Sequence, residues 1–198
     1  MKKASWIVLG ILATCIGLYP IIYFLIDRQF GLLGSKSEEL LSDTIWNTGF
    51  YGHIILGGLA LLIGWLQFSE KIRIYNIGLH RKIGITYVIA VLISGVCGLY
   101  IGFYATGGIV SQLGFISLGL VWLSTTIIAF NAAKNSNINL HEKMMIYSYA
   151  ACFAAVTLRI WLPMLTTLFE GDFIKAYRIV AWLCWVPNII FAYFIINK

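Results

Sequence analysis

Two of the three histidines in this chain lie in the same short motif, which occurs twice. The copies read NIGLHRK and NINLHEK, so the shared pattern is N-I-x-L-H-x-K. Asn76 and Asn137 are suited to cap helix starts, because an asparagine side chain accepts hydrogen bonds from the free N–H groups of a first helical turn. His80 and His141 would then lie in or near that turn, where the helix dipole favours the neutral imidazole that ligates metals.

The paired histidines are candidate cofactor ligands. If the spans that follow the motifs are parallel and diagonal in a bundle, His80 and His141 face each other at equal depth, as two axial ligands of a haem b would. His53 is a third candidate ligand. The alternative for the pair is a duplicated interfacial position at headgroup level, beside Arg81 and Lys82, with no ligand attached. The alternative for His53 is a core histidine bonded to a backbone carbonyl.

Arg159 is the stronger chemical signal, because apolar residues flank it on both sides in the stretch VTLRIWLP. A guanidinium inside a membrane is costly unless it is paired, so such arginines indicate function by default. No Asp or Glu occurs within the expected spans, so the partner must be a carbonyl, an amide, water or an anionic ligand. Pro163 is expected to kink this helix at Arg159, because it removes an amide donor. The alternative is that Arg159 snorkels to external headgroups.

Other polar residues are expected to join Arg159 in one outward-facing pocket. Asn188 follows a proline that breaks the hydrogen-bond ladder of the last apolar run near mid-membrane, where buried amides need partners. With Thr157, Trp185 and His53, it would line a pocket suited to a small amphipathic anion, a quinone or a haem propionate. The alternative for Trp185 is ordinary packing among other aromatic residues.

The elements that position these residues are transmembrane helices. Of the 198 residues, 60% are hydrophobic and only 11% are charged, whereas soluble domains have about a quarter of their residues charged. Apolar runs of about twenty residues are long enough to cross the hydrocarbon core of a bilayer as helices. The six expected spans are approximately residues 5–26, 47–68, 83–105, 111–130, 144–168 and 176–196.

The distribution of Lys and Arg predicts the orientation. The basic residues after the second and fourth spans fall on the cytoplasmic side if both termini are cytoplasmic, as the positive-inside rule requires. The external loop 27–46 is mixed in sign, so the net charge of +6 reflects topology and contact with anionic lipid, and nucleic acid is not expected as a partner. We therefore expect one all-α domain over residues 1–198, a six-helix bundle in which spans two–three and four–five form a parallel repeat.

The chain also resembles a known family. The segments LHRKIGITYV, GFYATGG, HEKMMIYSYAACFAAVTLRIWLP and AYRIVAWLCWVPN are similar to the bacterial membrane proteins of domain of unknown function 2306, over roughly residues 47–190. The resemblance supports the six-helix fold, with a multi-pass protein of the bacterial cytoplasmic membrane, and it implies no activity. The positions that match the family's motifs are His53, His80, His141, Arg159, Pro187 and Asn188. A looser likeness to b-type cytochrome bundles rests only on histidines within a helix bundle.

Three classes of function follow from these features. The first is a redox or cofactor-binding membrane protein that uses haem or quinone. The second is a transporter or a lipid- or anion-binding protein that uses the Arg159 pocket, and the third is an assembly factor for a membrane complex. No nucleophile–base pair, carboxylate pair or phosphate loop is present, so a hydrolase or kinase is disfavoured and no catalytic residue is assigned. The oligomeric state is left open.

Overall fold

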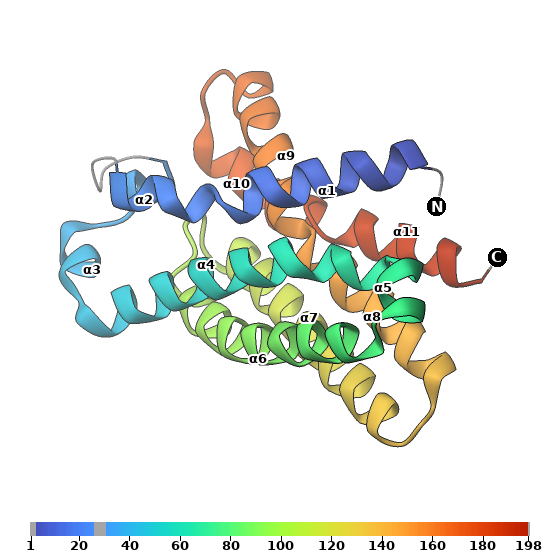
Figure 1. The fold of residues 1–198 in the computed structure, drawn as a ribbon. Coiled ribbons are helices and arrows are strands. Elements are labelled where there is room, and N and C mark those ends of the chain that lie inside the picture. Colours follow the sequence, from blue (N-terminus) through green and yellow to red (C-terminus); the bar gives the residue numbers. More distant parts are fainter. Residues whose placement is uncertain (1–2, 26–30, 198) are drawn as a thin grey trace.

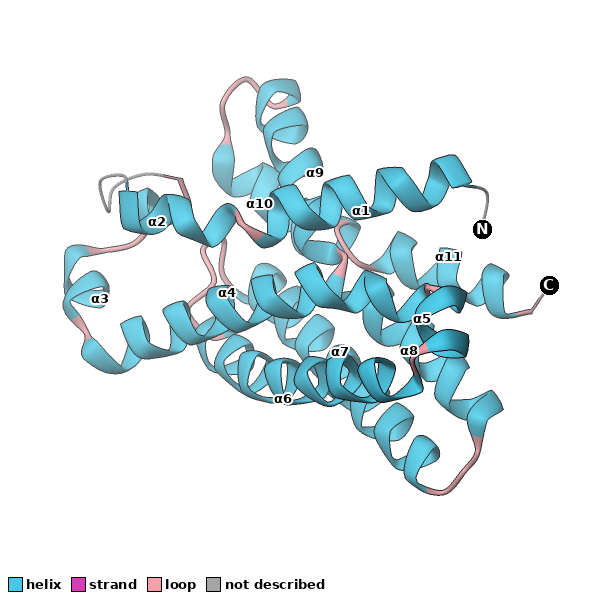
Figure 2. Ribbon diagram, viewed as in Figure 1, coloured by secondary structure: helices cyan, strands magenta, loops and turns pink. Residues whose placement is uncertain are grey.

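The described part of the chain consists of helices and the short loops that join them. A computed structural model describes residues 3–25 and 31–197, and Figure 2 shows helices joined by short loops with no strand in these two ranges. Residues 26–30, where the first expected span ends and the external loop 27–46 begins, lie outside the described residues. The elements are α1 (Lys3–Gly17), η1 (Tyr19–Ile21), α2 (Ile22–Leu25), η2 (Leu33–Ser35), α3 (Glu38–Ser42), α4 (Thr44–Gly64), η3 (Trp65–Phe68), α5 (Glu70–Tyr75), α6 (Ile77–Gly102), α7 (Ile109–Lys134), α8 (Ile138–Cys152), α9 (Ala154–Leu168), α10 (Phe173–Leu183) and α11 (Val186–Ile196).

Six stretches within the described residues are long and apolar enough to cross a bilayer, which confirms the expected all-α membrane fold. They are Trp6–Leu25, Thr44–Phe68, Ile77–Gly102, Ile109–Lys134, Ile138–Leu168 and Phe173–Ile196. Two of the stretches begin six residues before the expected spans, at Ile77 and Ile138, because each helix includes the motif that precedes its apolar run. The basic residues of the motifs therefore lie on the first turns of membrane helices.

The two motifs are helix starts, as predicted. The Asn76 side chain accepts a hydrogen bond from the backbone N–H of Leu79 at 2.9 Å. The Asn137 side chain accepts the equivalent bond from Leu140 at 3.1 Å. Each bond satisfies one of the N–H groups that a helix leaves free in its first turn. The duplicated phrase thus has a structural role that accounts for its asparagine.

The helices pack in a ring around a common core. Helix α4 packs on α6, α6 on α7, α7 on α8, and α8 on α4, while α11 packs on α8 and α10 packs on α7 and α9. Helix α1 crosses α4 where Gly17 and Gly58 meet, and a side chain at Gly58 would lie 2.6 Å from the Gly17 carbonyl oxygen. The start of α1 and the end of α11 lie at the same end of the molecule, opposite α3 (Figure 1).

A hydrogen-bonded cluster joins α6, α7 and α8 in the centre of the bundle. The Tyr87 hydroxyl and the Ser148 hydroxyl are 2.8 Å apart, and Ser148 is 2.7 Å from the Thr126 hydroxyl. All three residues are fully buried. Buried hydroxyl groups are stable in an apolar interior only when they are paired. The cluster therefore fixes the relative rotation of the three helices and leaves the helix faces beside it apolar.

The last two spans are each interrupted near their middle. The fifth is broken at Phe153, between α8 and α9, and the sixth at Cys184 and Trp185, between α10 and α11. Pro187 lies in the first turn of α11, where its missing N–H costs least, so the expected break in the sixth span is confirmed. Pro163 lies inside α9, and the fifth span is divided into α8 and α9 at Phe153. The expected kink at Arg159 stays a prediction.

The caps provide a test of the duplicated helix starts. We expect Asn76→Ala and Asn137→Ala each to lower the free energy of unfolding by about 1 kcal/mol, the usual contribution of an asparagine cap. Denaturant unfolding in mixed micelles measures the change. Asn131→Ala is the matched control, because Asn131 is exposed in the last turns of α7, away from any helix start. An equal loss in the control would contradict the capping role.

Candidate functional site

A cavity lies in the bundle between α1, α4, α6, α7 and α9. Its volume is about 230 Å3, and its walls are mostly aliphatic and aromatic side chains, with Trp46, Phe50 and Trp122 among them. Among the residues that the structure describes, the charged residues of the lining are Lys36 and Arg159, and no described Asp or Glu belongs to it. Two cations in an apolar enclosure without a carboxylate form a site complementary to a negatively charged, partly apolar molecule.

Glycines keep the walls of the cavity close together. The glycines of the lining lie on α4, α6 and α7, the three helices whose close packing forms one side of the cavity. A side chain at Gly98 would lie 2.7 Å from the His53 ring, and one at Gly57 would lie 3.0 Å from the Ser94 hydroxyl. Small residues at these positions let the helix backbones approach each other, as is common within membranes.

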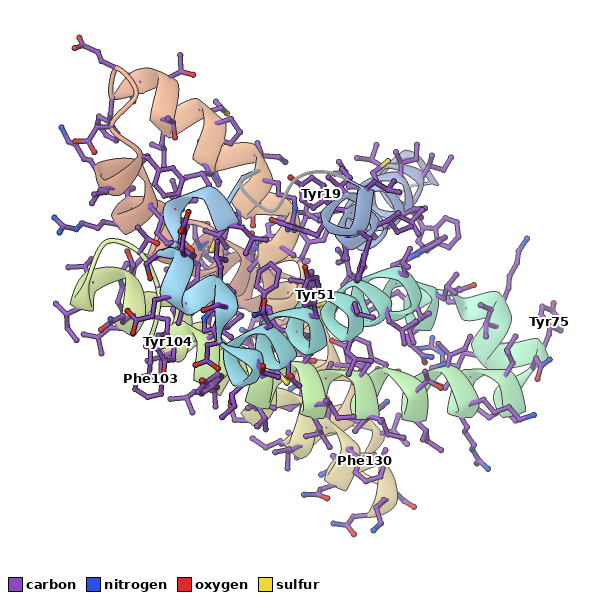
Figure 3. The ribbon with its side chains drawn as sticks, turned by 90° about the vertical axis from the view of Figure 1, so that its left-hand side faces the viewer. Tyr19, Tyr51, Tyr75, Phe103, Tyr104 and Phe130 are labelled. Carbon is purple, nitrogen blue, oxygen red and sulfur yellow. The ribbon has the colours of Figure 1, made fainter. Side chains whose placement is uncertain are left out.

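Arg159 extends from α9 into the cavity wall. Its Nη1 donates to the Ala155 carbonyl oxygen at 2.9 Å, and its guanidinium carbon lies 4.3 Å from the centre of the Tyr19 ring. Its Nε is buried and has no hydrogen-bond partner. Tyr19, labelled in Figure 3, comes from the turn after α1, so the contact joins the first and fifth spans. The carbonyl partner is one of those expected from the sequence, and it satisfies a single N–H of five.

His53 lines the same cavity as Arg159, so the structure brings these two predicted residues together. The His53 Nδ1 lies 2.9 Å from the Ser94 carbonyl oxygen, and the Ser94 hydroxyl donates to the His53 carbonyl oxygen at 2.9 Å. Because a carbonyl only accepts, Nδ1 carries the proton, and Nε2 of the neutral ring is an acceptor. The hydrogen bond to a backbone carbonyl is the alternative considered for this histidine, and it is confirmed.

Lys36 is a cavity residue that sequence reasoning missed. It follows η2, and its ammonium group donates to the Tyr104 carbonyl oxygen and, at 3.0 Å, to the Thr106 hydroxyl. Partial burial lowers the pKa of Lys36 to about 8, so the group is mostly charged at neutral pH. In the sequence it is one charge of a mixed-sign external loop, and no local pattern distinguishes it from its neighbours.

Thr157, Trp185 and Asn188 are not part of the cavity lining. They lie where the two interrupted spans meet. The Asn188 amide donates to the carbonyl oxygen of Cys184 at 3.0 Å and to the Thr157 hydroxyl at 3.2 Å, and Thr157 donates to the same carbonyl. The Trp185 indole donates to the Ala181 carbonyl oxygen at 3.0 Å. These side chains therefore satisfy backbone groups that the break in the sixth span leaves without partners.

His80 and His141 lie away from the cavity, at the starts of α6 and α8. An ion pair between Arg73 of α5 and Glu142, 3.0 Å long, joins α5 to the first turns of α8. The His141 Nδ1 is bonded to the Ala129 carbonyl oxygen at 2.9 Å, and the His80 Nδ1 is buried without a partner. A haem held by both rings needs an apolar space between them for its macrocycle. Neither histidine lines the cavity, so the two imidazoles are not placed to hold a haem there.

Residues 50–196 match one protein-family model, described as "Predicted membrane protein (DUF2306)". The match covers spans two to six. Residues 1–49, which include α1, Tyr19 and Lys36, lie outside it. No curated protein and no solved structure matches the chain.

The junction of the two interrupted spans gives a testable pair of asparagines. Asn188 and Asn197 both donate to the carbonyl oxygen four residues earlier, but Asn188 is partly buried and Asn197 is exposed. We expect Asn188→Ala to lower the free energy of unfolding by about 1–3 kcal/mol, because buried backbone oxygens lose their donor. Unfolding in micelles should show almost no change for Asn197→Ala. Equal effects would mean that the junction does not depend on Asn188.

Proposed function

This chain belongs to that family of predicted membrane proteins, and we propose that it binds an amphipathic organic anion in the cavity around Arg159. The observation that carries the proposal is the charge of the lining, which within residues 3–25 and 31–197 contains two cations and no carboxylate. Arg159 has one carbonyl partner and a buried Nε without any. Keeping such a group inside an apolar bundle is costly, and an anionic ligand would offset that cost.

The lining also favours an apolar part of the ligand. Aromatic side chains of Phe50, Trp122 and Tyr177 form the walls together with aliphatic residues. Contact of such surfaces with a hydrocarbon chain removes apolar area from polar surroundings. Arg159 would hold the head group through charge-assisted hydrogen bonds, which are stronger than bonds between neutral groups. The ligand class is therefore a carboxylate or similar anion attached to an apolar chain.

A quinone is the second candidate, and His53 is the observation that favours it. A quinone oxygen can accept from Arg159, and the Nε2 of His53 can accept a proton from a quinol, because Nδ1 is occupied by the Ser94 carbonyl. Decylubiquinone distinguishes the two candidates. The quinone proposal predicts that decylubiquinone displaces a bound carboxylate. If saturating decylubiquinone does not compete with the carboxylate, the quinone proposal is wrong.

The paired helix interruptions favour transport of the anion over permanent storage. Membrane transporters form their substrate sites near mid-membrane from discontinuous helices. Here the fifth span is interrupted at Phe153, between the lining residues Cys152 and Ala154, whereas the interruption of the sixth span lies outside the lining and is joined to the fifth span by Asn188. The transport proposal predicts uptake of labelled decanoate by proteoliposomes, abolished by Arg159→Gln. Saturable binding without uptake would restrict the function to binding.

Binding is tested directly by ligand-dependent stabilisation. In neutral detergent, saturating decanoate should raise the unfolding temperature of the native protein, because a ligand that binds only the folded state stabilises it. We expect Arg159→Gln to weaken decanoate binding by about tenfold to a hundredfold, the effect of losing charge-assisted hydrogen bonds of about 1.5–3 kcal/mol. Arg159→Lys should retain part of the affinity, since it keeps the charge without the planar fork.

Two controls accompany this measurement. Arg178→Gln should leave the affinity unchanged, because Arg178 is exposed and donates to the Gly107 carbonyl outside the cavity. Decanol should stabilise the protein much less than decanoate does. If decanol and decanoate are equivalent, or if Arg159→Gln binds decanoate as the native protein does, the anion-binding proposal is wrong.

A further inference from the structure

Lys36 supplies the cavity with a second charge that comes from a different part of the chain than Arg159. It lies between η2 and α3, in the segment outside the family match, whereas Arg159 lies on α9 within it. Lys36 is held by the Tyr104 carbonyl and the Thr106 hydroxyl, just after the end of α6. Figure 3 shows Tyr104 at the end of the bundle opposite Tyr75, the residue that precedes the first motif. Each cation is thus fixed to a different wall of the same cavity.

The ammonium of Lys36 has no acidic partner among the residues that the structure describes. Among the described residues the ion pair is that of Arg73 with Glu142, and Lys36 takes no part in it. The acidic residues nearest to Lys36 in sequence, Glu38 and Glu39, are exposed on α3 and form no ion pair with it. Two of the three ammonium N–H groups are used by neutral acceptors, so among the described residues one donor is left for a ligand.

Other residues of the same N-terminal segment complete the cavity. Pro20 is buried in the wall, Trp46 lines it as well, and Tyr19 covers the guanidinium of Arg159. The segment therefore forms part of the site in addition to crossing the membrane. It closes the site on one side and adds an aromatic contact and a cation to the residues of the matched region. The charge of the lining depends on this segment as much as on α9.

We infer that Lys36 is a specificity-determining residue and that the ligand is an amphipathic dianion, with one anionic group at Arg159 and a second at Lys36. The inference rests on the proposed function and names its substrate class. Lys36 lies beside Thr106 and Arg159 lies beside Tyr19, and most of the other lining residues are apolar, so the two groups would be joined by a hydrocarbon chain, as in an α,ω-dicarboxylate. A monoanion would occupy Arg159 and leave Lys36 without a counter-charge.

Dicarboxylates of graded length test this inference. Thermal stabilisation in neutral detergent gives the affinities of α,ω-dicarboxylates from six to fourteen carbons and of monocarboxylates of equal length. We expect one dicarboxylate length to bind at least tenfold more tightly than its monocarboxylate. Lys36→Gln and Lys36→Met should remove that advantage, so that the dicarboxylate binds no more tightly than its monocarboxylate. Lys175→Gln is the control, because Lys175 is exposed at the start of α10 and lies outside the cavity.

The results separate this inference from the proposed function. If no dicarboxylate exceeds its monocarboxylate, or if Lys175→Gln has the same effect as Lys36→Gln, Lys36 does not select the ligand. Monocarboxylate binding that depends on Arg159 would still support the anion-binding proposal in that case. If neither series binds in an Arg159-dependent manner, the proposed function fails, and the role of Lys36 fails with it.

Discussion

The positive charge of Arg159 is the constraint around which the outer part of this bundle is organised. A guanidinium among apolar helices needs partners, and this one has a carbonyl oxygen of its own helix and the face of Tyr19. Cation–π contact contributes about 0.5–2 kcal/mol, which is less than the several kcal/mol that burial of a charge costs. The contact with Tyr19 holds the first span against the fifth, and the part of the burial cost that it does not offset leaves the site favourable for an anion.

The rest of the fold keeps this charge in a defined place. The hydroxyl cluster of Tyr87, Thr126 and Ser148 fixes the central helices, and glycines on α4, α6 and α7 allow the backbones to approach beside it. The interrupted spans are satisfied by Asn188 and Thr157, so polar groups at mid-membrane are paired within the protein.

Local sequence signals predicted the helices and their starts well. The caps at Asn76 and Asn137 and the break near Pro187 follow from backbone chemistry within one turn, so the sequence alone contains them. The sequence also predicted that His53 and Arg159 share one site, because their expected depths in the membrane are similar. Lys36 could not be found in this way, because its place in the cavity results from packing a loop against Tyr104 and Thr106, far along the chain. The interruption at Phe153 likewise carries no proline or glycine signal.

The central claim is that an anionic head group binds at Arg159 with its apolar chain inside the bundle. Photolabelling tests it most directly, with a decanoate analogue that carries a diazirine at the end of the chain. After irradiation in nanodiscs, peptide mass spectrometry should find the label on lining residues such as Leu61 and Trp122, and excess decanoate should prevent it. Labelling confined to exposed, lipid-facing residues such as Ile85 and Ile89, without competition by decanoate, would contradict the account.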